Sequence, residues 1–318
     1  MWSLVFLSTF ALAAASHWDD FFNFIKTHDR TYHTKDLFEH RFQVFVENMV
    51  YARKMNEVQS NYTLGVGPFA DLTVDEFREF HMKDVSLSRT CSAFKPTGGN
   101  TPSSLDWRDS NKVTDVKDQG QCGSCWSFSA TGAMEGAWAI ANDDLVSLSE
   151  QQLVDCSSTF EYGNHGCNGG LMDSAFNYAM QHGMCSEASY SYHAKQGDCQ
   201  ECQSVVTMSD CHDVPPNNQL ALKEAVSMGP VSVAIEADTR TFQLYTSGVI
   251  TGDACGTNLD HGVLVAGYGE ENNTPFWLVK NSWSADWGEK GYVKIGRSES
   301  TNDPGVCGIA MQPSFPVV

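Results

Sequence analysis

Residues 119–130 read QGQCGSCWSFSA, and this stretch determines how the rest of the chain is interpreted. From Cys125 onward, apolar and small residues recur at intervals of three and four, which is the spacing of one buried face of a helix: Trp126, Ala130, Ala133, Ala137 and Ile140. Cys125 would open this helix, where unpaired backbone N–H groups and the helix dipole lower the pKa of a thiol. Because the thiolate is the nucleophilic form of cysteine, the sequence predicts that Cys125 is reactive.

Cys125 could instead be one half of a structural disulfide or of a redox pair. The chain contains 11 cysteines, and an odd number leaves one thiol unpaired or paired outside the chain, so Cys125 need not belong to a disulfide. In the redox case, Cys122 and Cys125 form the C-x-x-C pair of a thiol–disulfide oxidoreductase. Such a pair would follow a strand in a thioredoxin-like unit, whereas the residues before it, VTDVKDQGQ, are polar.

Polar residues elsewhere could complete a site for nucleophilic catalysis. His261 follows Cys125 by 136 residues in NLDHGVLVAGYG, and Asn281 follows it by 156 residues in LVKNSWSADWG. A thiol nucleophile needs a base, and the base needs a group that orients it. Gln119 and the Cys125 backbone N–H would donate to an oxyanion. With ten histidines in the chain, spacing alone would be weak support for His261.

Four segments occur together in the order found in papain-like cysteine proteases: QGQCGSCWSFSA, GCNGGLMD, NLDHGVLVAGYG and VKNSWSADWGEKGYVKI. C-G-S-C-W is the local signature of that family's nucleophile, with His and Asn expected about 130–150 residues downstream. The chain resembles this family, most closely its cathepsin L branch. The resemblance implies peptide-bond hydrolysis through an acyl-enzyme and no metal or other cofactor. It also implies an α+β, papain-like two-lobed fold, with an α-helical lobe, a β-barrel-like lobe and a cleft between them.

The resemblance assigns roles to individual residues. Cys125, His261, Asn281 and Gln119 fall on the family's catalytic positions, and Trp283 and Trp287 on tryptophans that shield the His–Asn pair. The implied substrate-binding residues are Gly123, Gly169, Gly170, Leu171, Met172, Ala234, Leu259, Gly262, Trp283 and Gln312. Most of these are apolar, so an apolar side chain is expected at the second position before the cut. Leu171 and Met172 could instead be core residues.

The spacing of two cysteines bears on the type of peptidase. Only 11 residues separate Cys156 from Cys167, and no long His-containing insertion follows. Their closeness argues against the exopeptidase branch of the family, whose extra loop blocks the cleft.

Before residue 101 the sequence predicts a signal peptide and an inhibitory prosegment. Residues 1–15 are mostly apolar and end in small residues, as a signal peptide does, so we expect a signal peptide at 1–15, a propeptide at 16–100 and a peptidase domain at 101–318. Two amphipathic helices are expected, one with Trp18, Phe21, Phe22 and Ile25 and one with Phe38, Phe42, Phe45, Met49 and Met55. The second resembles the family's inhibitory helix at Arg41, Phe45, Asn48 and Asn56, and departs from it at Leu37 and Ala52. A downstream motif appears as Gly65, Gly67, Phe69 and Asp71, with Gly67 in place of Asn.

Residues 82–104 are rich in Ser, Thr, Gly and Pro, which predicts a loop that is open to cleavage. We expect acid-induced self-processing between about Ser92 and Ser104. Residues 1–100 carry 12 acidic and 10 basic side chains, whereas residues 101–318 carry 27 and 10. Lys and Arg of the prosegment would therefore pair with carboxylates of the peptidase domain at neutral pH, and acidification would weaken the pairing.

Secretory routing by the predicted signal peptide makes a disulfide framework the expectation for the cysteines. Family pairing would join Cys122–Cys167, Cys156–Cys199 and Cys255–Cys307. Cys91, Cys185, Cys202 and Cys211 are then extra, and Cys202 could compete with Cys199 for Cys156. A zinc site of Cys199, Cys202, Cys211 and His212 is the alternative, although an oxidising compartment favours disulfides. Asn61 and Asn272 lie in N-x-T glycosylation sequons.

The composition is that of a globular protein with a strongly acidic surface. Hydrophobic residues make up 42% of the chain and charged residues 19%, and the net charge is −19. This charge disfavours nucleic-acid and anionic membrane partners. We expect a monomer in the secretory pathway, destined for the lysosome, the vacuole or the extracellular space. The expected partners are protein and peptide substrates, the chain's own propeptide as inhibitor, and cystatin-like inhibitors. A catalytically silent scaffold protein is the rival interpretation.

Overall fold

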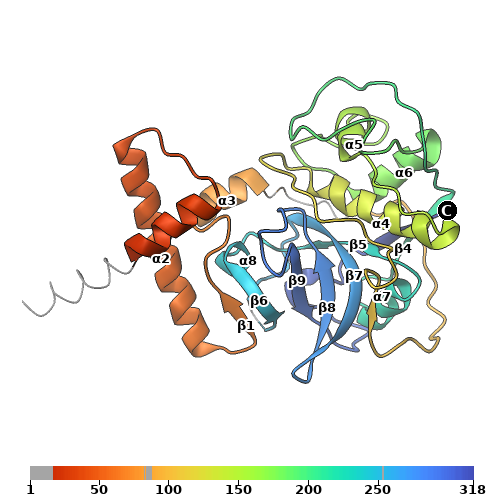
Figure 1. Ribbon diagram of the computed structural model, residues 1–318. Coiled ribbons are helices and arrows are strands. Elements are labelled where there is room, and N and C mark those ends of the chain that lie inside the picture. Colours follow the sequence, from red (N-terminus) through yellow and green to blue (C-terminus); the bar gives the residue numbers. More distant parts are fainter. Residues whose placement is uncertain (1–16, 82, 84–87, 253) are drawn as a thin grey trace, which may run out of the picture.

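A computed structural model describes residues 17–81, 83, 88–252 and 254–318 (Figure 1). The predicted signal peptide lies outside these residues. A helical prosegment packs beside a two-lobed body, in which helices form one lobe and a sheet the other. The two-lobed arrangement expected from the sequence, with one helical lobe and one lobe built on a sheet, is therefore observed.

The prosegment is a small helical unit with an aromatic core. Residues 17–27 are helical, and α2 (Lys35–Val58), β1 (Tyr62–Leu64) and α3 (Val74–His81) follow. Trp18 stacks on Phe42 with ring centroids 3.5 Å apart. Asn48 donates to the carbonyls of Ala70 and Leu72, 2.9 Å away in each case, and so ties α2 to the chain that leads into α3.

The residues that depart from the family's prosegment pattern are accommodated. Leu37 is exposed on α2, whereas Ala52 is buried in the prosegment core, where its small side chain is apolar as the expected Ile would be. An ideal Cβ at Gly67 would contact no described residue within 4 Å, so the backbone there does not require glycine.

The helical lobe is built around α4 (Cys125–Asn142), with α5 (Glu150–Cys156) and α6 (Met172–His182) packed on it. Two glycines let α4 approach its neighbours closely. A Cβ at Gly132 would lie 2.8 Å from Leu264, and one at Gly136 would lie 2.6 Å from Pro230. Trp126, Ala130 and Ala133 of the predicted apolar stripe are buried, whereas Ala137 is half-buried and Ile140 is exposed, so the stripe predicts the buried face correctly only over the first part of the helix.

The second lobe is a sheet with short helices at its margins. Its elements after α6 are β4 (Asp210–Asp213), α7 (Gln219–Val226), β5 (Val231–Ile235), α8 (Arg240–Gln243), β6 (Tyr245–Ile250), β7 (His261–Glu271), β8 (Thr274–Lys280), β9 (Tyr292–Gly296), the 3-10 helix η1 (Val306–Gly308) and β10 (Ser314–Val317). The strand order is β1-β6-β9-β8-β7-β5-β10-β4-β2, where β2 is Ser92–Ala93, and β3 (Leu105–Asp106) pairs with β7. The apolar run GVLVAGYG lies in β7 and is buried between neighbouring strands.

The expectation of a β-barrel-like lobe is wrong in one respect. Within the described residues the sheet begins at β1 and ends at β2, and no pairing of these two strands closes it into a barrel. The reason is that both edges are occupied by segments from the N-terminal part of the chain. β1 pairs antiparallel with β6, and β2 (Ser92–Ala93) pairs parallel with β4.

The predicted loop at residues 82–104 is correspondingly more ordered than its composition suggests. Positions 82 and 84–87 lie outside the described residues, but Ser92 and Ala93 form a strand. The local sequence did not predict this strand, because the strand depends on pairing with β4, which lies about 120 residues later in the chain.

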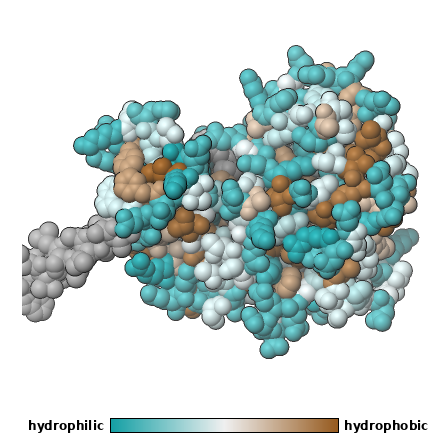
Figure 2. All heavy atoms as spheres, viewed as in Figure 1, coloured by the Kyte–Doolittle hydropathy of each residue, from teal (hydrophilic) through white to brown (hydrophobic). Residues whose placement is uncertain are grey.

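No described helix is long and apolar enough to cross a membrane. Figure 2 shows a face covered mainly by hydrophilic residues, with hydrophobic ones in small groups among them, which fits the net charge of −19.

Candidate active site

Cys125 is the first residue of α4 and the one free thiol among the eleven cysteines, all of which lie in the described residues. Its Sγ accepts a hydrogen bond from the backbone N–H of Gly262 at 3.3 Å. The sequence led us to expect a lowered thiol pKa, but burial raises the pKa of Cys125 to about 11. In the closed precursor, burial outweighs the hydrogen bonds and the helix terminus, and the thiol holds its proton.

His261 and Asn281 form the second part of the site. His261 opens β7, and Asn281 follows the last residue of β8. The Nε2 atom of His261 lies 2.7 Å from the Oδ1 atom of Asn281. Oδ1 also accepts from the backbone N–H of Ser282 at 2.8 Å, so the atom in this position is an acceptor. Nε2 must then carry a hydrogen, which leaves Nδ1 of a neutral imidazole as the basic nitrogen.

Two tryptophans enclose this pair. The ring of Trp283 stacks on His261 with centroids 4.6 Å apart and an angle of 25° between the planes. Trp287 meets Trp283 edge-on at 4.9 Å, and its indole N–H donates to the carbonyl of Phe242. The pair is thereby kept from water, which strengthens the His–Asn hydrogen bond.

Gln119 is buried and its amide is held in a fixed orientation. Its Oε1 accepts from the Ser282 hydroxyl at 2.7 Å, and its Nε2 donates to the Cys122 carbonyl at 3.0 Å. The backbone carbonyl of Gln119 accepts from the Tyr192 hydroxyl at 2.8 Å. Ser282 and Tyr192 were missed in the sequence. Ser282 follows Asn281 directly, and this adjacency was the only available signal.

Three of the residues expected to bind substrate belong to one apolar cluster that includes Trp126, the residue after Cys125. Met172, Ala234 and Leu259 are buried in one apolar cluster together with Trp126, while Leu171 is only half-buried. Gly170 has no room for a side chain, because a Cβ there would lie 2.6 Å from Trp126. Met311, which the sequence did not single out, packs against the same cluster.

Gln312 was expected at the end of the substrate pocket. Its side chain is buried, and its Nε2 donates to the carbonyl of Ser88 at 2.9 Å. Its Oε1 has no hydrogen-bond partner in the part of the chain that the structure describes. The polar group expected at the end of the pocket is thus held by a residue of the predicted propeptide.

The prosegment covers this arrangement. The backbone N–H of Lys83 donates to the carbonyl of Asp260 at 3.1 Å. Its side chain runs along two glycines that are expected to line the cleft, since a Cβ at Gly123 would lie 2.6 Å from Lys83 Cγ and one at Gly169 would lie 3.2 Å from Lys83 Cβ. Phe69 and Phe77 both pack edge-on against Trp283, at 5.7 and 5.2 Å.

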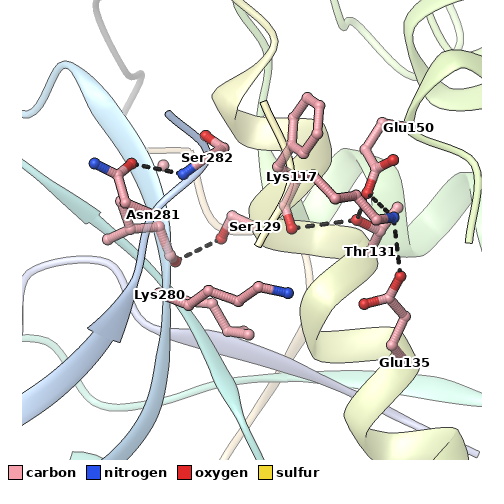
Figure 3. A pocket seen from close by; sticks show the side chains of 12 residues that line it. Lys117, Ser129, Thr131, Glu135, Glu150, Lys280, Asn281 and Ser282 are labelled. Atoms are coloured by element: carbon pink, nitrogen blue, oxygen red, sulfur yellow. Dashed lines mark hydrogen bonds and ion pairs between the residues drawn. The ribbon is translucent and has the colours of Figure 1, made fainter. Parts of the chain in front are cut away.

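Behind the site lies a buried group of charges between the two lobes (Figure 3). Lys117 lies 2.7 Å from Glu150 and 3.2 Å from Glu135, and Lys280 lines the same small cavity of about 20 Å³. Burial raises the pKa of Glu150 to about 7, whereas the Lys117 and Lys280 ammonium groups hold the pKa of Glu135 below its usual range despite its burial. The cavity is too small for a substrate, so we assign these charges to lobe packing next to Asn281.

Five disulfides are formed. Cys122–Cys167, Cys156–Cys199 and Cys255–Cys307 are the pairs implied by the resemblance, and the extra cysteines form Cys91–Cys211 and Cys185–Cys202. The pairing of Cys122 with Cys167 removes the C-x-x-C redox alternative. The zinc alternative is also wrong, since its three cysteines belong to three different disulfides, and the described residues contain no group of metal ligands.

Both sequons lie at the surface. Asn61 is exposed, and Asn272 is exposed in the turn between β7 and β8. Their use in glycosylation stays a prediction.

Comparison with known proteins gives consistent matches. Residues 101–317 match the family described as papain family cysteine protease, and residues 21–77 match the cathepsin propeptide inhibitor domain (I29). "Probable cysteine protease RD21B" of Arabidopsis thaliana is 46% identical over 287 residues, which cover 88% of this chain and 61% of that protein. The chain therefore spans less than two thirds of this relative's length.

Solved structures of precursors have the same architecture. "Recombinant stem bromelain precursor" matches with a TM-score of 0.88 at 36% identity, covering 95% of this chain and 99% of that one. The digestive procathepsin L 3 of Tenebrio molitor larval midgut matches with a TM-score of 0.86 at 39% identity, with coverages of 95% and 99%.

Proposed function

Because this chain belongs to the papain family of cysteine proteases and carries the family's inhibitory prosegment, we propose that it is the zymogen of an endopeptidase whose nucleophile is Cys125. The observation that carries the proposal is the placement of one free thiol at the start of α4, in contact with the residue after His261. The rival interpretation of a silent scaffold protein gives no reason for these groups to be kept together.

The geometry supports the following chemistry. Once the prosegment leaves the cleft, the proton of Cys125 passes to Nδ1 of His261, and the thiolate attacks the carbonyl carbon of the scissile bond. The imidazolium keeps its Nε2–H on Asn281 and then protonates the leaving amine from Nδ1. Water attacks the resulting thioester, His261 takes up its proton, and the acid product leaves with Cys125 restored as a thiol.

The negative charge that develops on the oxygen of the scissile carbonyl is stabilised by hydrogen-bond donors that are already in position. We assign this role to the Nε2–H of Gln119 and the backbone N–H of Cys125. The Ser282 hydroxyl supports the assignment, because its hydrogen bond to Oε1 keeps the amide nitrogen from exchanging places with the oxygen. Donors that need no reorganisation at the moment of reaction contribute most to the rate.

Specificity is assigned to the apolar cluster beside Cys125. Met172, Ala234 and Leu259 would surround the second side chain before the cut, with Gln312 at the end of the pocket. An apolar side chain would bury well there, whereas a guanidinium would meet an amide rather than a carboxylate. Leu171 and the backbone at Gly169 and Gly170 would form the wall along the substrate.

We also propose routing through the secretory pathway to a lysosome-like, vacuolar or extracellular site. Five disulfides support it, because such bonds form and persist in oxidising compartments. The substrates would be proteins and peptides, and cystatin-like proteins would be inhibitors of the open cleft.

The test is hydrolysis of a fluorogenic peptide by acid-treated precursor, compared with the Cys125→Ala precursor prepared in the same way. The wild-type protein should cleave the peptide and should be inactivated by one equivalent of a thiol-directed epoxide. The variant should fold and do neither. Peptide cleavage that survives in pure Cys125→Ala protein would refute the assignment.

A further inference from the structure

The disulfide Cys91–Cys211 joins two parts of the chain that activation is expected to separate. Cys91 lies within the predicted propeptide, 120 residues before Cys211 in β4 of the peptidase domain. Neither cysteine belongs to a pair implied by the family resemblance. A precursor cut on the C-terminal side of Cys91 would consist of two chains that are still covalently joined.

The residues around Cys91 are bound to the peptidase domain on both sides of this bond. We call residues 88–99 the anchor segment. On its N-terminal side, Thr90 accepts a hydrogen bond from Asn177 through its hydroxyl and donates its N–H to Asp173, at 2.9 and 3.0 Å. The guanidinium of Arg89 lies 3.6 Å from the carboxylate of Asp213.

On its C-terminal side, the anchor segment continues as an edge strand. Ser92 and Ala93 pair with β4, and the N–H of Phe94 donates to the carbonyl of Asp213 at 2.8 Å. The ring of Phe94 meets Phe315 of β10 edge-on at 5.4 Å.

The end of the anchor segment is held by one carboxylate. The Thr97 N–H and hydroxyl and the Gly98 N–H all donate to Glu224 of α7, at 2.7, 2.7 and 3.0 Å. These three bonds hold the pKa of Glu224 below its usual value. The residues beyond, up to Ser104, are mostly exposed, and they are the accessible part of the predicted cleavage region.

We infer that Cys91–Cys211 is a covalent tether that keeps the anchor segment on the peptidase domain after the chain is cut. A cut in residues 95–104 leaves the whole prosegment attached through the disulfide. A cut before Ser88 leaves the anchor segment as the start of the mature chain. In both cases the peptidase domain carries residues that the predicted boundary at residue 101 assigns to the propeptide.

The tether has a consequence for inhibition. A prosegment that is released from the cleft but still attached stays at an effective concentration in the millimolar range, set by the length of the linking chain. It can return to the cleft without a second-order encounter. Retention of Ser88 would also keep its carbonyl on Gln312 at the end of the substrate pocket.

The test follows the Cys91 peptide through maturation. Wild-type precursor is allowed to process at acid pH, and the reaction is stopped with iodoacetamide. The masses of the products are then measured by intact mass spectrometry, without and with reduction. The unreduced peptidase should contain residues 88–94. Reduction should release them together with the prosegment if the cut lies after Cys91, and should not release them if it lies before Ser88. An unreduced mature enzyme that lacks the Cys91 peptide would overturn the inference.

The tether depends on the proposed function only because that function supplies the cut. Two controls therefore test the tether separately from the proposed function. The Cys91→Ser/Cys211→Ser double variant should lose the prosegment completely after a cut beyond Cys91, whereas Cys185→Ser/Cys202→Ser, which removes a disulfide inside the peptidase domain, should retain it. If the double variant fails to fold, the Cys125→Ala precursor is digested without reduction and its peptides are mapped. The Cys91–Cys211 cross-link must be found in this digest, and absence of the cross-link would refute the inference. If wild-type protein does not process itself, the tether is tested on Cys125→Ala precursor trimmed with pepsin, and the proposed function is tested separately by peptide hydrolysis.

Discussion

The Nε2 atom of His261 lies 2.7 Å from the Oδ1 atom of Asn281, and that oxygen is held in place by the backbone N–H of the next residue, Ser282. The imidazole is therefore oriented by an amide whose own orientation is fixed by the backbone. Since Nε2 carries the proton, the basic nitrogen of the neutral imidazole is Nδ1.

Replacing Asn281 should accordingly impair catalysis more than binding. We expect Asn281→Ala to lower kcat by about 10²-fold, because an unfixed imidazole is seldom in the productive tautomer and orientation. Asn281→Asp keeps an acceptor at the same place and should retain more activity than the alanine variant. Steady-state kinetics on one fluorogenic peptide would compare kcat of the two variants with that of the wild type. Equal activity of Asn281→Ala and wild type would remove Asn281 from its proposed role.

Gln119 and Ser282 should act together on the oxyanion. Gln119→Ala should lower kcat by about 10²–10³-fold, which is the usual cost of one such donor. Gln119→Glu has nearly the same shape but no amide N–H and should lose at least as much. Ser282→Ala leaves the donor present but no longer oriented through Oε1, so a smaller loss is expected. If Ser282→Ala were as inactive as Gln119→Ala, Ser282 would need a role other than orientation.

The pocket should favour apolar side chains. We expect kcat/KM for Leu, Phe or Val at the second position before the cut to exceed that for Arg by about tenfold or more. Gln312→Glu should narrow this gap, because a carboxylate attracts a guanidinium. A matched peptide series assayed with both enzymes would measure the change. A wild-type enzyme that cleaves the Arg peptide equally well would contradict the role given to Gln312.

The sequence was most informative where one motif imposes its own local structure. The stripe that starts at Trp126 predicted α4, although its last member Ile140 is exposed, and the apolar run after His261 predicted β7, which is buried as expected. The thiol, the imidazole and the amide could be selected because their motifs are specific.

What the sequence did not reveal depends on contacts between distant residues. β2 has only two residues and exists through pairing with β4, and the partner of Cys91 could not be chosen among the extra cysteines from spacing. The pKa of Cys125 moved in the unexpected direction because burial of the thiol depends on the whole closed precursor rather than on its place in a helix.

Acid activation was expected to depend on ion pairs between the prosegment and the peptidase domain, and the described residues support this only in part. Arg78 lies 2.7 Å from Asp238 across the interface, and Arg89 lies 3.6 Å from Asp213. However, burial and the neighbouring Asp173 raise the pKa of Asp213 to about 7. A carboxyl whose pKa is higher in the folded than in the unfolded protein stabilises the folded form more as the pH falls. Asp213 therefore opposes release of the prosegment by acid.

Two prosegment groups have the right sign. Burial and then Arg30 lower the pKa of His28 from 6.5, so the stability linked to its neutral form is complete above that pH and is lost as the pH falls through the lowered value. His28 lines a surface pocket with Trp283 and Asp286 of the peptidase domain. The Asp286 carboxylate favours the charged imidazole, but burial and Arg30 outweigh it in setting the pKa of His28, so charging of His28 would on balance destabilise the folded precursor.

Glu76 acts in a lower pH range. Although burial raises its pKa, the hydrogen bond from Arg41 brings the net pKa below 4.5. Its contribution is therefore present above pH 4.5 and is lost as the pH falls below that value. Because this pair lies inside the prosegment, its loss would destabilise the fold of the inhibitor itself.

We therefore expect processing to start below about pH 6.5 and to become much faster below about pH 4.5. The precursor would be incubated from about pH 4 to about pH 7.5 and followed by intact mass, with Cys125→Ala in parallel. His28→Gln removes the first step, so processing near pH 6 should slow several-fold while the rate near pH 4 changes little. Glu76→Gln mimics the protonated carboxyl and should allow processing at a higher pH than wild type. Processing that is as fast at about pH 7.5 as at pH 4, or that proceeds in isolated Cys125→Ala, would refute acid-induced self-cleavage.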